Sequence, residues 1–248
     1  EPNVERVDPQ LTAGNRKAMA GYAAEHFLWA VDGGVATITL NRPAHRNRLE
    51  NQDLRALLAH FEAVNHNQDV RVLVLTANTD GQPRPVFCAG YDIGGFGEAD
   101  PHAVDFHHVP DTLAAMRPIT ICALNGSVYG GATDVVLACD LVLAQTGHEW
   151  RMPACAIGLH YYASGLQRYV TQFGLAAAKR AFLTAKVFNT SELHDLGVLE
   201  TCADSTALNH ALKQLVKDVL AMAPLAVQAT KQSLNEIAAG QYNSDVLR

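Results

Sequence analysis

The sequence predicts an α/β fold in which helices cover a mainly parallel sheet. Short apolar runs of strand length alternate with segments of helical apolar spacing through most of the chain. Past about residue 165 only the helical spacing continues, which predicts a helical C-terminal region. The length of 248 residues suits one large domain, or a core with a small appendage.

Strands are expected where β-branched and apolar residues form runs that end at turn residues. The expected strands are residues 27–31, 35–40, 72–76, 119–124 and 141–144. Asp32-Gly33-Gly34, between the first two runs, is a strong hairpin signal. The sheet is therefore expected to begin with a hairpin and to continue through parallel strands.

Helices are expected where apolar residues recur every three or four positions. One begins near Asn51, its predicted N-cap, and another spans the region from Asp100 to Met116. In the C-terminal part we expect a helix at 174–183, a second capped by Ser191 and stopped by Gly197, and two more separated by Pro224. An apolar face is expected on the first of these last two helices at Leu208, Leu212, Leu215, Val216, Val219 and Leu220.

Three segments are expected along the chain. Residues 1–24 are polar and weakly patterned, and are interpreted as an N-terminal extension. Residues 25–190 form the core, and residues 191–248 form the C-terminal helical region. Apolar helical faces alone do not reveal whether that region contacts another subunit.

Composition excludes some functions and favours a reduced environment. The formal net charge of −6 argues against a general nucleic-acid surface, and no apolar run approaches the roughly 20 residues of a membrane span. The chain has five cysteines, an odd number, without CxxC or Cys/His metal spacing. We therefore expect reduced core thiols, no metal site and a cytoplasmic protein.

The stretch from Asn125 to Asp140 combines a strand-to-helix turn with a carboxylate. Gly130 and Gly131 allow backbone conformations that side chains forbid, and they let a ligand approach the unpaired N–H groups of a helix's first turn. Asp134 follows about one helical turn later. Free N–H groups beside a carboxylate suit a reaction that forms an oxyanion and moves a proton. The alternative is a tight packing turn with a helix-capping aspartate.

Two spaced motifs resemble those of the crotonase (enoyl-CoA hydratase/isomerase) superfamily. The segment FCAGYD, from Phe87 to Asp92, matches the family's F-x-A/S-G-x-D, and LNGSVYGGATD, from Leu124 to Asp134, matches its V-N-G-x-x-x-G-G-x-x-E/D. The resemblance runs from about Phe27 to Leu234. It implies a ββα spiral with C-terminal helices that assemble trimers or dimers of trimers, and no cofactor apart from coenzyme A carried by an acyl-CoA substrate.

The same resemblance implies an oxyanion hole and a CoA site. The two backbone donors that stabilise the enolate map to Tyr91 and Gly131, and such a pair of donors contributes several kcal/mol. The residues expected to contact CoA and the thioester are His45, Arg46, Arg48, Ala89, Gly90, Tyr91, Asp92, Ile93, Gly130 and Gly131.

The catalytic carboxylates depart from the hydratase pattern. The first glutamate of the family's hydratases maps to Asp134, and the second maps to Ala154, which can neither activate water nor donate a proton. Hydration through two carboxylates is therefore not expected. Asp134 remains the expected catalytic carboxylate, either as a base that shuttles a proton or as a group that positions or protonates an enolate.

The segment RMPACAIGLHYY, from Arg151 to Tyr162, is similar to the corresponding segment of methylmalonyl-CoA decarboxylase-like members, whose tyrosine maps to Tyr161. The resemblance implies that Tyr161 or His160 orients a leaving carboxylate. The expected activity is that of an acyl-CoA lyase or isomerase of fatty acid metabolism, acting by decarboxylation or double-bond isomerisation. Two alternatives remain open: a CoA-independent C–C bond hydrolase of this fold, and a degenerate acyl-CoA-binding or RNA-binding member.

Overall fold

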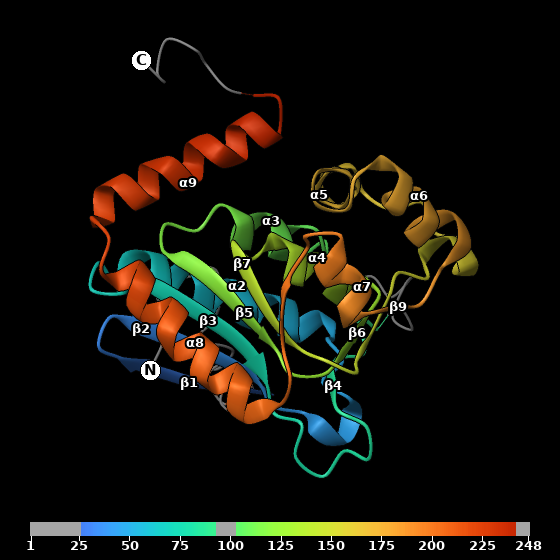
Figure 1. Cartoon of the computed structure of the whole chain (residues 1–248), viewed down its shortest axis with the longest axis horizontal. Helices are drawn as coiled ribbons and strands as arrows, with labels where there is room; N and C mark the ends of the chain where they lie inside the picture. Colours follow the sequence, from blue (N-terminus) through green and yellow to red (C-terminus); the bar gives the residue numbers. More distant parts are fainter. Residues whose placement is uncertain (1–25, 93–102, 242–248) are drawn as a thin grey trace.

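The core of the fold is a six-stranded sheet, seen in a computed structural model that describes residues 26–92 and 103–241 (Figure 1). Its strands lie in the order β1-β2-β3-β5-β7-β10, and only the β1–β2 pair is antiparallel. They are β1 (Phe27–Asp32), β2 (Val35–Leu40), β3 (Val72–Ala77), β5 (Ile119–Leu124), β7 (Leu141–Gln145) and β10 (Glu200–Cys202). The hairpin and the strands expected from the sequence are confirmed.

A smaller sheet lies beside the first and alternates with it along the chain. Its strands are β4 (Val86–Cys88), β6 (Ser127–Tyr129), β8 (Glu149–Arg151) and β9 (Phe188–Asn189), in that order. Strands β3, β5 and β7 of the large sheet are each followed by a strand of the small sheet and then by a helix. This repeat is the ββα spiral that the crotonase resemblance implies.

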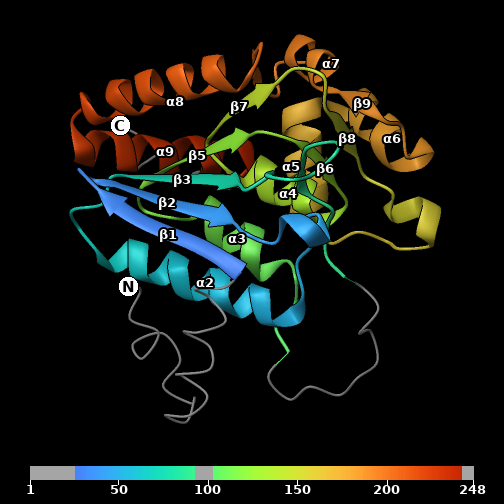
Figure 2. The same ribbon diagram turned by 90° about the horizontal axis from the view of Figure 1, so that it is seen from below.

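The helices cover both faces of the large sheet. In chain order they are η2 (Pro43–His45), α2 (Asn51–His66), α3 (His108–Ala114), α4 (Gly131–Ala138), η4 (Ala154–Ile157), α5 (Ala163–Phe173), α6 (Leu175–Thr184), α7 (Thr190–Asp195), α8 (Ser205–Leu220) and α9 (Pro224–Ala238). Helices α8 and α9 lie on one face of the sheet, and α2 and α3 lie on the other (Figure 2). In the described part of the chain, no helix combines the length and apolar character needed to cross a bilayer.

Strand periodicity divides the apolar residues between these two layers. Val72 and Val74 of β3 pack against the apolar face of α8, whereas Leu73 and Leu75 point into the main core. The expected apolar face of α8 is confirmed by Leu212, Leu215 and Val216.

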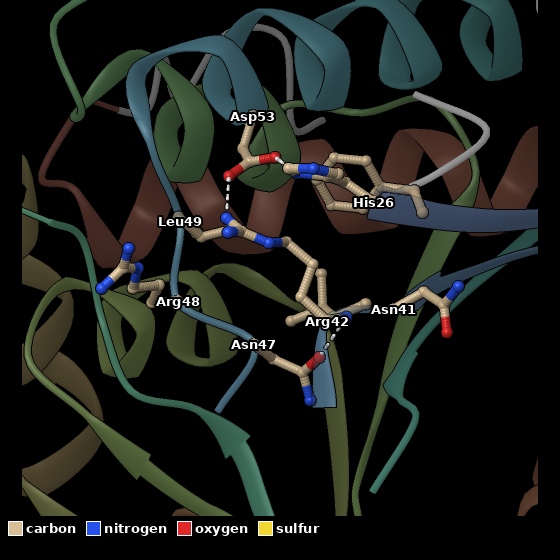
Figure 3. A pocket seen from close by; sticks show the side chains of 9 residues that line it. His26, Asn41, Arg42, Asn47, Arg48, Leu49 and Asp53 are labelled. Carbon is tan, nitrogen blue, oxygen red and sulfur yellow. Dashed lines mark hydrogen bonds and ion pairs between the residues drawn. The ribbon is translucent and has the colours of Figure 1, made fainter. Parts of the chain in front are cut away.

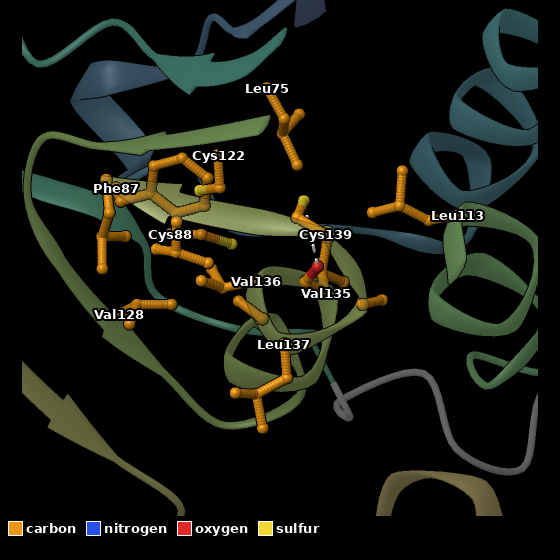
Figure 4. Close-up of a cluster of buried hydrophobic side chains, with 14 of the residues drawn as sticks. Leu75, Phe87, Cys88, Leu113, Cys122, Val128, Val135, Val136, Leu137 and Cys139 are labelled. Carbon is orange, nitrogen blue, oxygen red and sulfur yellow. Dashed lines mark hydrogen bonds between the residues drawn. The ribbon is translucent and has the colours of Figure 1, made fainter. Parts of the chain in front are cut away.

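The main core surrounds α4, which is almost wholly buried (Figure 4). The thiols of Cys88, Cys122 and Cys139 lie inside it, and burial raises the pKa of Cys88 to about 12. All five cysteines are free, and Cys155 is exposed. The core thiols are therefore packing groups rather than nucleophiles.

Several expected helix boundaries are wrong by a few residues. At two of them, the N-cap is the residue whose side chain forms a reciprocal capping box with the third residue of the helix. Glu50, not Asn51, is the N-cap of α2, since its side chain and that of Asp53 form a reciprocal capping box. Asn189, not Ser191, caps α7 in the same way. Helix α3 begins only at His108, although the sequence predicts a helix over the whole region from Asp100.

The sheet also extends past the expected end of the core. Strand β10 lies beyond residue 190 and pairs with β7, so the C-terminal region contributes an edge strand as well as helices. The expected N-terminal extension lies outside the described residues.

Candidate active site

The two glycine-rich motifs meet in the structure. Gly90 and Gly130 both have positive φ, +107° and +60°, and a Cβ on Gly90 would lie 2.9 Å from the carbonyl oxygen of Tyr129. Only glycine allows this approach of two backbones. The segment FCAGYD and the N-terminus of α4 therefore form one continuous surface.

The backbone around Tyr91 is aligned by a single bridge to Leu49. The Leu49 N–H donates to the Gly90 oxygen at 2.9 Å, and the Asp92 N–H donates to the Leu49 oxygen at 2.8 Å. Successive peptide groups of an extended chain alternate in direction, so the Tyr91 N–H faces away from Leu49. Gly131 is the first residue of α4, and its N–H is among those that the helix cannot pair.

An aromatic cluster, which we define as Tyr91, Phe106, Tyr161 and Tyr162, lies at this junction. The Phe106 ring packs on the Cα of Gly131, where an added Cβ would lie 2.8 Å from the ring edge. Ring centroids are 5.2 Å apart for Phe106 and Tyr91, and 4.2 Å apart for Tyr161 and Tyr162. The Tyr91 hydroxyl donates to Asn51, which ties the cluster to the start of α2.

Asp134 lies next to this cluster and is completely buried, with 0% of its side chain exposed. Arg168 of α5 binds it through two hydrogen bonds of 2.7 Å, from Nε to Oδ1 and from Nη2 to Oδ2. The Tyr162 hydroxyl also donates to Oδ2. Among the described residues no backbone N–H donates to Asp134, so its carboxylate does not cap α4.

Arg168 joins two carboxylates rather than one. Its Nη2 lies 3.0 Å from Oδ1 of Asp111 on α3, so one guanidinium links α3, α4 and α5. Although burial alone lowers the pKa of Arg168, the hydrogen bonds and negative charges of Asp134 and Asp111 raise it. The group stays cationic, and this set of three charges is net negative.

The two tyrosines form a directed chain of hydroxyl groups toward Asp134. An ionised carboxylate only accepts, so the Tyr162 proton points to Asp134. Tyr161 and Tyr162 are 3.0 Å apart between their oxygens, and Tyr161 is then the donor of that bond. Burial, followed by the charge of Asp134, raises the pKa of both phenols, so both remain neutral near pH 7.

Two other positions that the sequence analysis names, His160 and Ala154, are not part of this series of hydroxyl groups. His160 is exposed at the surface just before Tyr161. Ala154, at the place of the hydratases' second glutamate, is buried with 2% exposure in η4. The structure therefore brings Asp134, Tyr161 and the Gly131 turn together, and it leaves His160 facing solvent.

The residues expected to contact CoA lie on two adjoining segments. The Ala89 N–H donates to the Arg46 oxygen at 2.9 Å, which joins the segment of His45, Arg46 and Arg48 to that of Ala89–Asp92. The Arg46 guanidinium lies 5.6 Å from the ring centroid of Tyr129. Arg48 already contacts Glu50 at 3.3 Å and Asp92 at 3.9 Å. Ile93 lies outside the described residues.

A separate small hollow adjoins this segment (Figure 3). Arg42, Arg48 and Asp53 line it, and none of the aromatic cluster does. His26 and Asp53 contact each other there at 2.9 Å, across the start of α2. The hollow shares Arg48 with the expected CoA residues, but it is distinct from the chemistry around Asp134.

Three possible cation ligands gather at the start of α3. One ligand atom each of Asp105, His107 and His108 lies within 4.8 Å of the others. Asp105 and His108 are exposed, and the His107 ring lies 5.8 Å from that of Tyr162. The cluster places two titratable rings and a carboxylate at the edge of the aromatic cluster.

Comparison with known proteins agrees with this geometry. A family model described as enoyl-CoA hydratase/isomerase matches residues 30–246. The chain therefore belongs to the enoyl-CoA hydratase/isomerase family, which has the crotonase fold.

Individual relatives differ in the reactions that their names describe. The 2,3-dehydroadipyl-CoA hydratase of Escherichia coli K12 is 30% identical over 206 residues, covering 82% of this chain and 78% of its own. An enoyl-CoA hydratase/isomerase family protein from Hyphomonas neptunium has a TM-score of 0.78 at 24% identity, covering 90% of this chain and 86% of its own. A methylmalonyl-CoA decarboxylase has a TM-score of 0.77 at 23% identity, covering 89% and 84%. The two structures support the fold alone.

Sequence reasoning missed the partners of Asp134. From the sequence, no role is assigned to Arg168 or Asp111, and in the segment from Arg151 to Tyr162 roles are assigned to Tyr161 and His160 but not to Tyr162. The contacts span 34 residues from Asp134 to Arg168 and 28 from Asp134 to Tyr162. No local pattern reveals such pairs. The one available signal was an arginine inside an otherwise weakly charged helix that follows the Tyr161-Tyr162 pair.

Proposed function

We propose that this protein is an acyl-CoA decarboxylase that removes the free carboxylate of a malonyl-type thioester and returns the enolate as a saturated acyl-CoA. The observation that carries this is the environment of Asp134. A carboxylate that already accepts two bonds from Arg168 and one from Tyr162 loses them when it takes up a proton. Both of its oxygens are therefore already occupied by donors, and the reaction that suits the site needs no base at its first step.

The backbone donors would stabilise the enolate. In this proposal the thioester oxygen lies between the N–H groups of Tyr91 and Gly131, on the surface where Gly90 meets Gly130. Loss of CO2 breaks the C–C bond to the carboxylate, and its electron pair forms the enolate, whose charge rests on that oxygen. Donors placed in advance for this charge are worth several kcal/mol.

The aromatic cluster would desolvate and orient the leaving carboxylate. A mostly apolar surface replaces the water around the leaving carboxylate, and desolvation favours the loss of its charge as neutral CO2. To orient that carboxylate, the Tyr161 hydroxyl would turn its single proton from Tyr162 to the substrate. The enolate then takes one proton from solvent at its α-carbon, and the acyl-CoA product is released.

Hydration and double-bond isomerisation fit less well. Hydration in this family needs a second carboxylate, and Ala154 stands in its place. Isomerisation needs a base that first removes a proton from the substrate, and the ion pair of Asp134 opposes that step. The relatives named as hydratases make hydration the first activity that must be excluded by measurement.

Binding and assembly follow the family in this proposal. CoA would contact the segments of Arg46 and Ala89, and the protein would work in the cytoplasm as a trimer or a dimer of trimers. The C-terminal helix α9 supports assembly because Leu225, Leu234 and Ile237 are 79%, 61% and 48% exposed. Sedimentation velocity of the full chain measures the oligomeric state.

A turnover screen with mass-spectrometric readout tests the proposed reaction. The substrates are malonyl-CoA, methylmalonyl-CoA, 3-hexenoyl-CoA and crotonyl-CoA. We expect CO2 release from a malonyl-type thioester, with crotonyl-CoA hydration at least a hundredfold slower. Isomerisation of 3-hexenoyl-CoA without any CO2 release would replace the proposal, and rapid hydration of crotonyl-CoA would refute it.

A matched glycine pair controls for the oxyanion geometry. Gly90→Ala places a Cβ against the Tyr129 oxygen at a strained φ, whereas Gly81→Ala meets no atom within 4 Å at a comparably positive φ of +74°. Gly90→Ala should abolish turnover, and Gly81→Ala should preserve it. Equal activity of both variants would remove the Gly90–Gly130 junction from the mechanism.

A further inference from the structure

We propose that Arg168 determines the reaction specificity of this site by holding Asp134 in an ion pair, so that Asp134 cannot remove the α-proton of a bound acyl-CoA. The inference rests on the proposed function, because it concerns the same thioester site. It predicts that replacing Arg168 gives the enzyme a base-dependent reaction that it otherwise lacks: exchange of the α-hydrogen of a saturated acyl-CoA with solvent.

Arg168 and Tyr162 occupy both oxygens of Asp134. Arg168 binds both oxygens of Asp134 at 2.7 Å, in the parallel two-bond geometry that only a guanidinium provides. Oδ2 also accepts from Tyr162. With 0% of the Asp134 side chain exposed, no solvent competes for these oxygens.

Arg168 is itself anchored. Its third contact, to Asp111 at 3.0 Å, holds the guanidinium against α3. Arg168 would have to give up its contact with Asp111 to follow Asp134 if that carboxylate turned toward substrate. A base that must first break two charge-assisted hydrogen bonds in a buried site is strongly disfavoured.

The position of Asp134 on α4 would also suit a base at the α-carbon. Asp134 lies one helical turn after Gly131, on the helix whose N-terminus faces the proposed thioester. Freed from Arg168, it would lie on the α-carbon side of that thioester. Removal of an α-proton breaks a C–H bond, its electron pair forms the enolate, and an O–H bond forms on Asp134. Reversal in D2O returns deuterium to the α-carbon after the acid proton exchanges with solvent.

The experiment measures deuterium uptake at the α-carbon of butanoyl-CoA in D2O by mass spectrometry. Butanoyl-CoA has no free carboxylate, so decarboxylation does not contribute. Wild type should exchange no faster than buffer, and Arg168→Met should exchange at least tenfold faster. Arg168→Met with Asp134→Asn should return to the wild-type rate.

Two further variants separate this role from a structural one. Tyr162→Phe removes one bond to Asp134 but keeps Arg168, so it should show no exchange. Arg168→Lys keeps a cation in the buried site but cannot hold both oxygens in parallel, so it should fold and exchange at an intermediate rate. Melting curves show that each variant is folded, and calorimetric titration shows that it binds butanoyl-CoA.

Three results would overturn the inference. They are exchange in Tyr162→Phe comparable to that in Arg168→Met, exchange that persists in the double variant, and a folded, butanoyl-CoA-binding Arg168→Lys enzyme that exchanges no faster than wild type. Failure of the proposed function has a different signature. Wild type would then release no CO2 from malonyl thioesters, or would not bind butanoyl-CoA, whereas the exchange measurement does not depend on CO2 release.

Discussion

Asp53 and Asp134 are two buried aspartates with nearly the same local position and different partners. Asp53 is the third residue of α2 and Asp134 the fourth of α4, and their side chains are 1% and 0% exposed. Asp53 accepts from the backbone N–H of Glu50 at 2.7 Å and contacts His26. Within residues 26–92 and 103–241, the partners of Asp134 are all side chains, from another helix and the loop before it.

The difference in partners distinguishes Asp53, whose carboxylate caps its own helix, from Asp134, whose carboxylate is part of the candidate active site. Asp53 completes a capping box, and its backbone partner lies three residues away. No side chain caps α4 among the described residues, and Asp134 is paired instead with Arg168 of α5, which also contacts Asp111 of α3. A first-turn aspartate that does not cap its own helix and pairs with a distant side chain therefore indicates a candidate site.

The largest expected effect is on stability at the Asp134 site. Asp134→Asn removes the carboxylate from a buried ion pair and leaves Arg168 with Asp111 alone. Breaking such a pair typically costs 3–5 kcal/mol. We expect a loss of about 3 kcal/mol in the free energy of unfolding, because Asp111 remains as a partner. Urea denaturation of both proteins at pH 7 measures it, and a loss below about 1 kcal/mol would show that the pair is only loosely formed.

The next effect is a pH dependence in the layer between β1 and α2, where Asp53 also lies. His60 is buried against the Trp29 ring at 5.0 Å, and neither of its ring nitrogens has a hydrogen-bond partner in the described part of the chain. Burial lowers the pKa of His60 from 6.5 to about 4. The unfolded chain therefore binds a proton at higher pH than the folded one, so stability should fall as the pH drops from 6.5 toward 4.

The size of that effect follows from the same pKa values. The gap between 6.5 and about 4 corresponds to about 3 kcal/mol over the whole range, of which part is reached by pH 5. Urea denaturation at pH 7 and pH 5 measures the difference. His60→Leu should flatten this part of the profile by about 2 kcal/mol while the remaining acid dependence persists. An unchanged slope in the variant would assign the pH dependence to other groups.

Most of the fold was predictable because strands and hairpins depend on local patterns. The hairpin at Gly33-Gly34 and the parallel strands appear where apolar runs and turn residues place them. Helix ends were less predictable. Glu50 and Asn189 cap their helices through reciprocal hydrogen bonds, but nearby Asn51 and Ser191 are also residue types that commonly cap helices.

The site was predictable only in part. Gly90, Gly130 and Asp134 lie in the two motifs that resemble those of the crotonase superfamily, and that resemblance assigns all three to one site. The charge state and freedom of Asp134 depend on Arg168, which reaches it only after α5 docks on α4. Adjacent tyrosines add a similar ambiguity, because resemblance points to Tyr161, while the hydroxyl that contacts Asp134 belongs to Tyr162.

The smallest expected effect is the loss of stability in Asp53→Asn, which tests whether Asp53 is purely structural. Asp53→Asn keeps an oxygen that can accept from the Glu50 N–H, so the cap of α2 should survive. The negative charge that faces His26, and Arg42 at 3.9 Å, is lost. We expect a loss of about 1 kcal/mol in unfolding free energy at pH 7 and unchanged turnover on the best acyl-CoA substrate. Asp53→Ala, which also removes the cap, should cost about 1 kcal/mol more. If instead Asp53→Asn lowers turnover while leaving stability intact, Asp53 serves the site through the segment of Arg42 and Arg48, and burial with a backbone partner would no longer mark a purely structural aspartate.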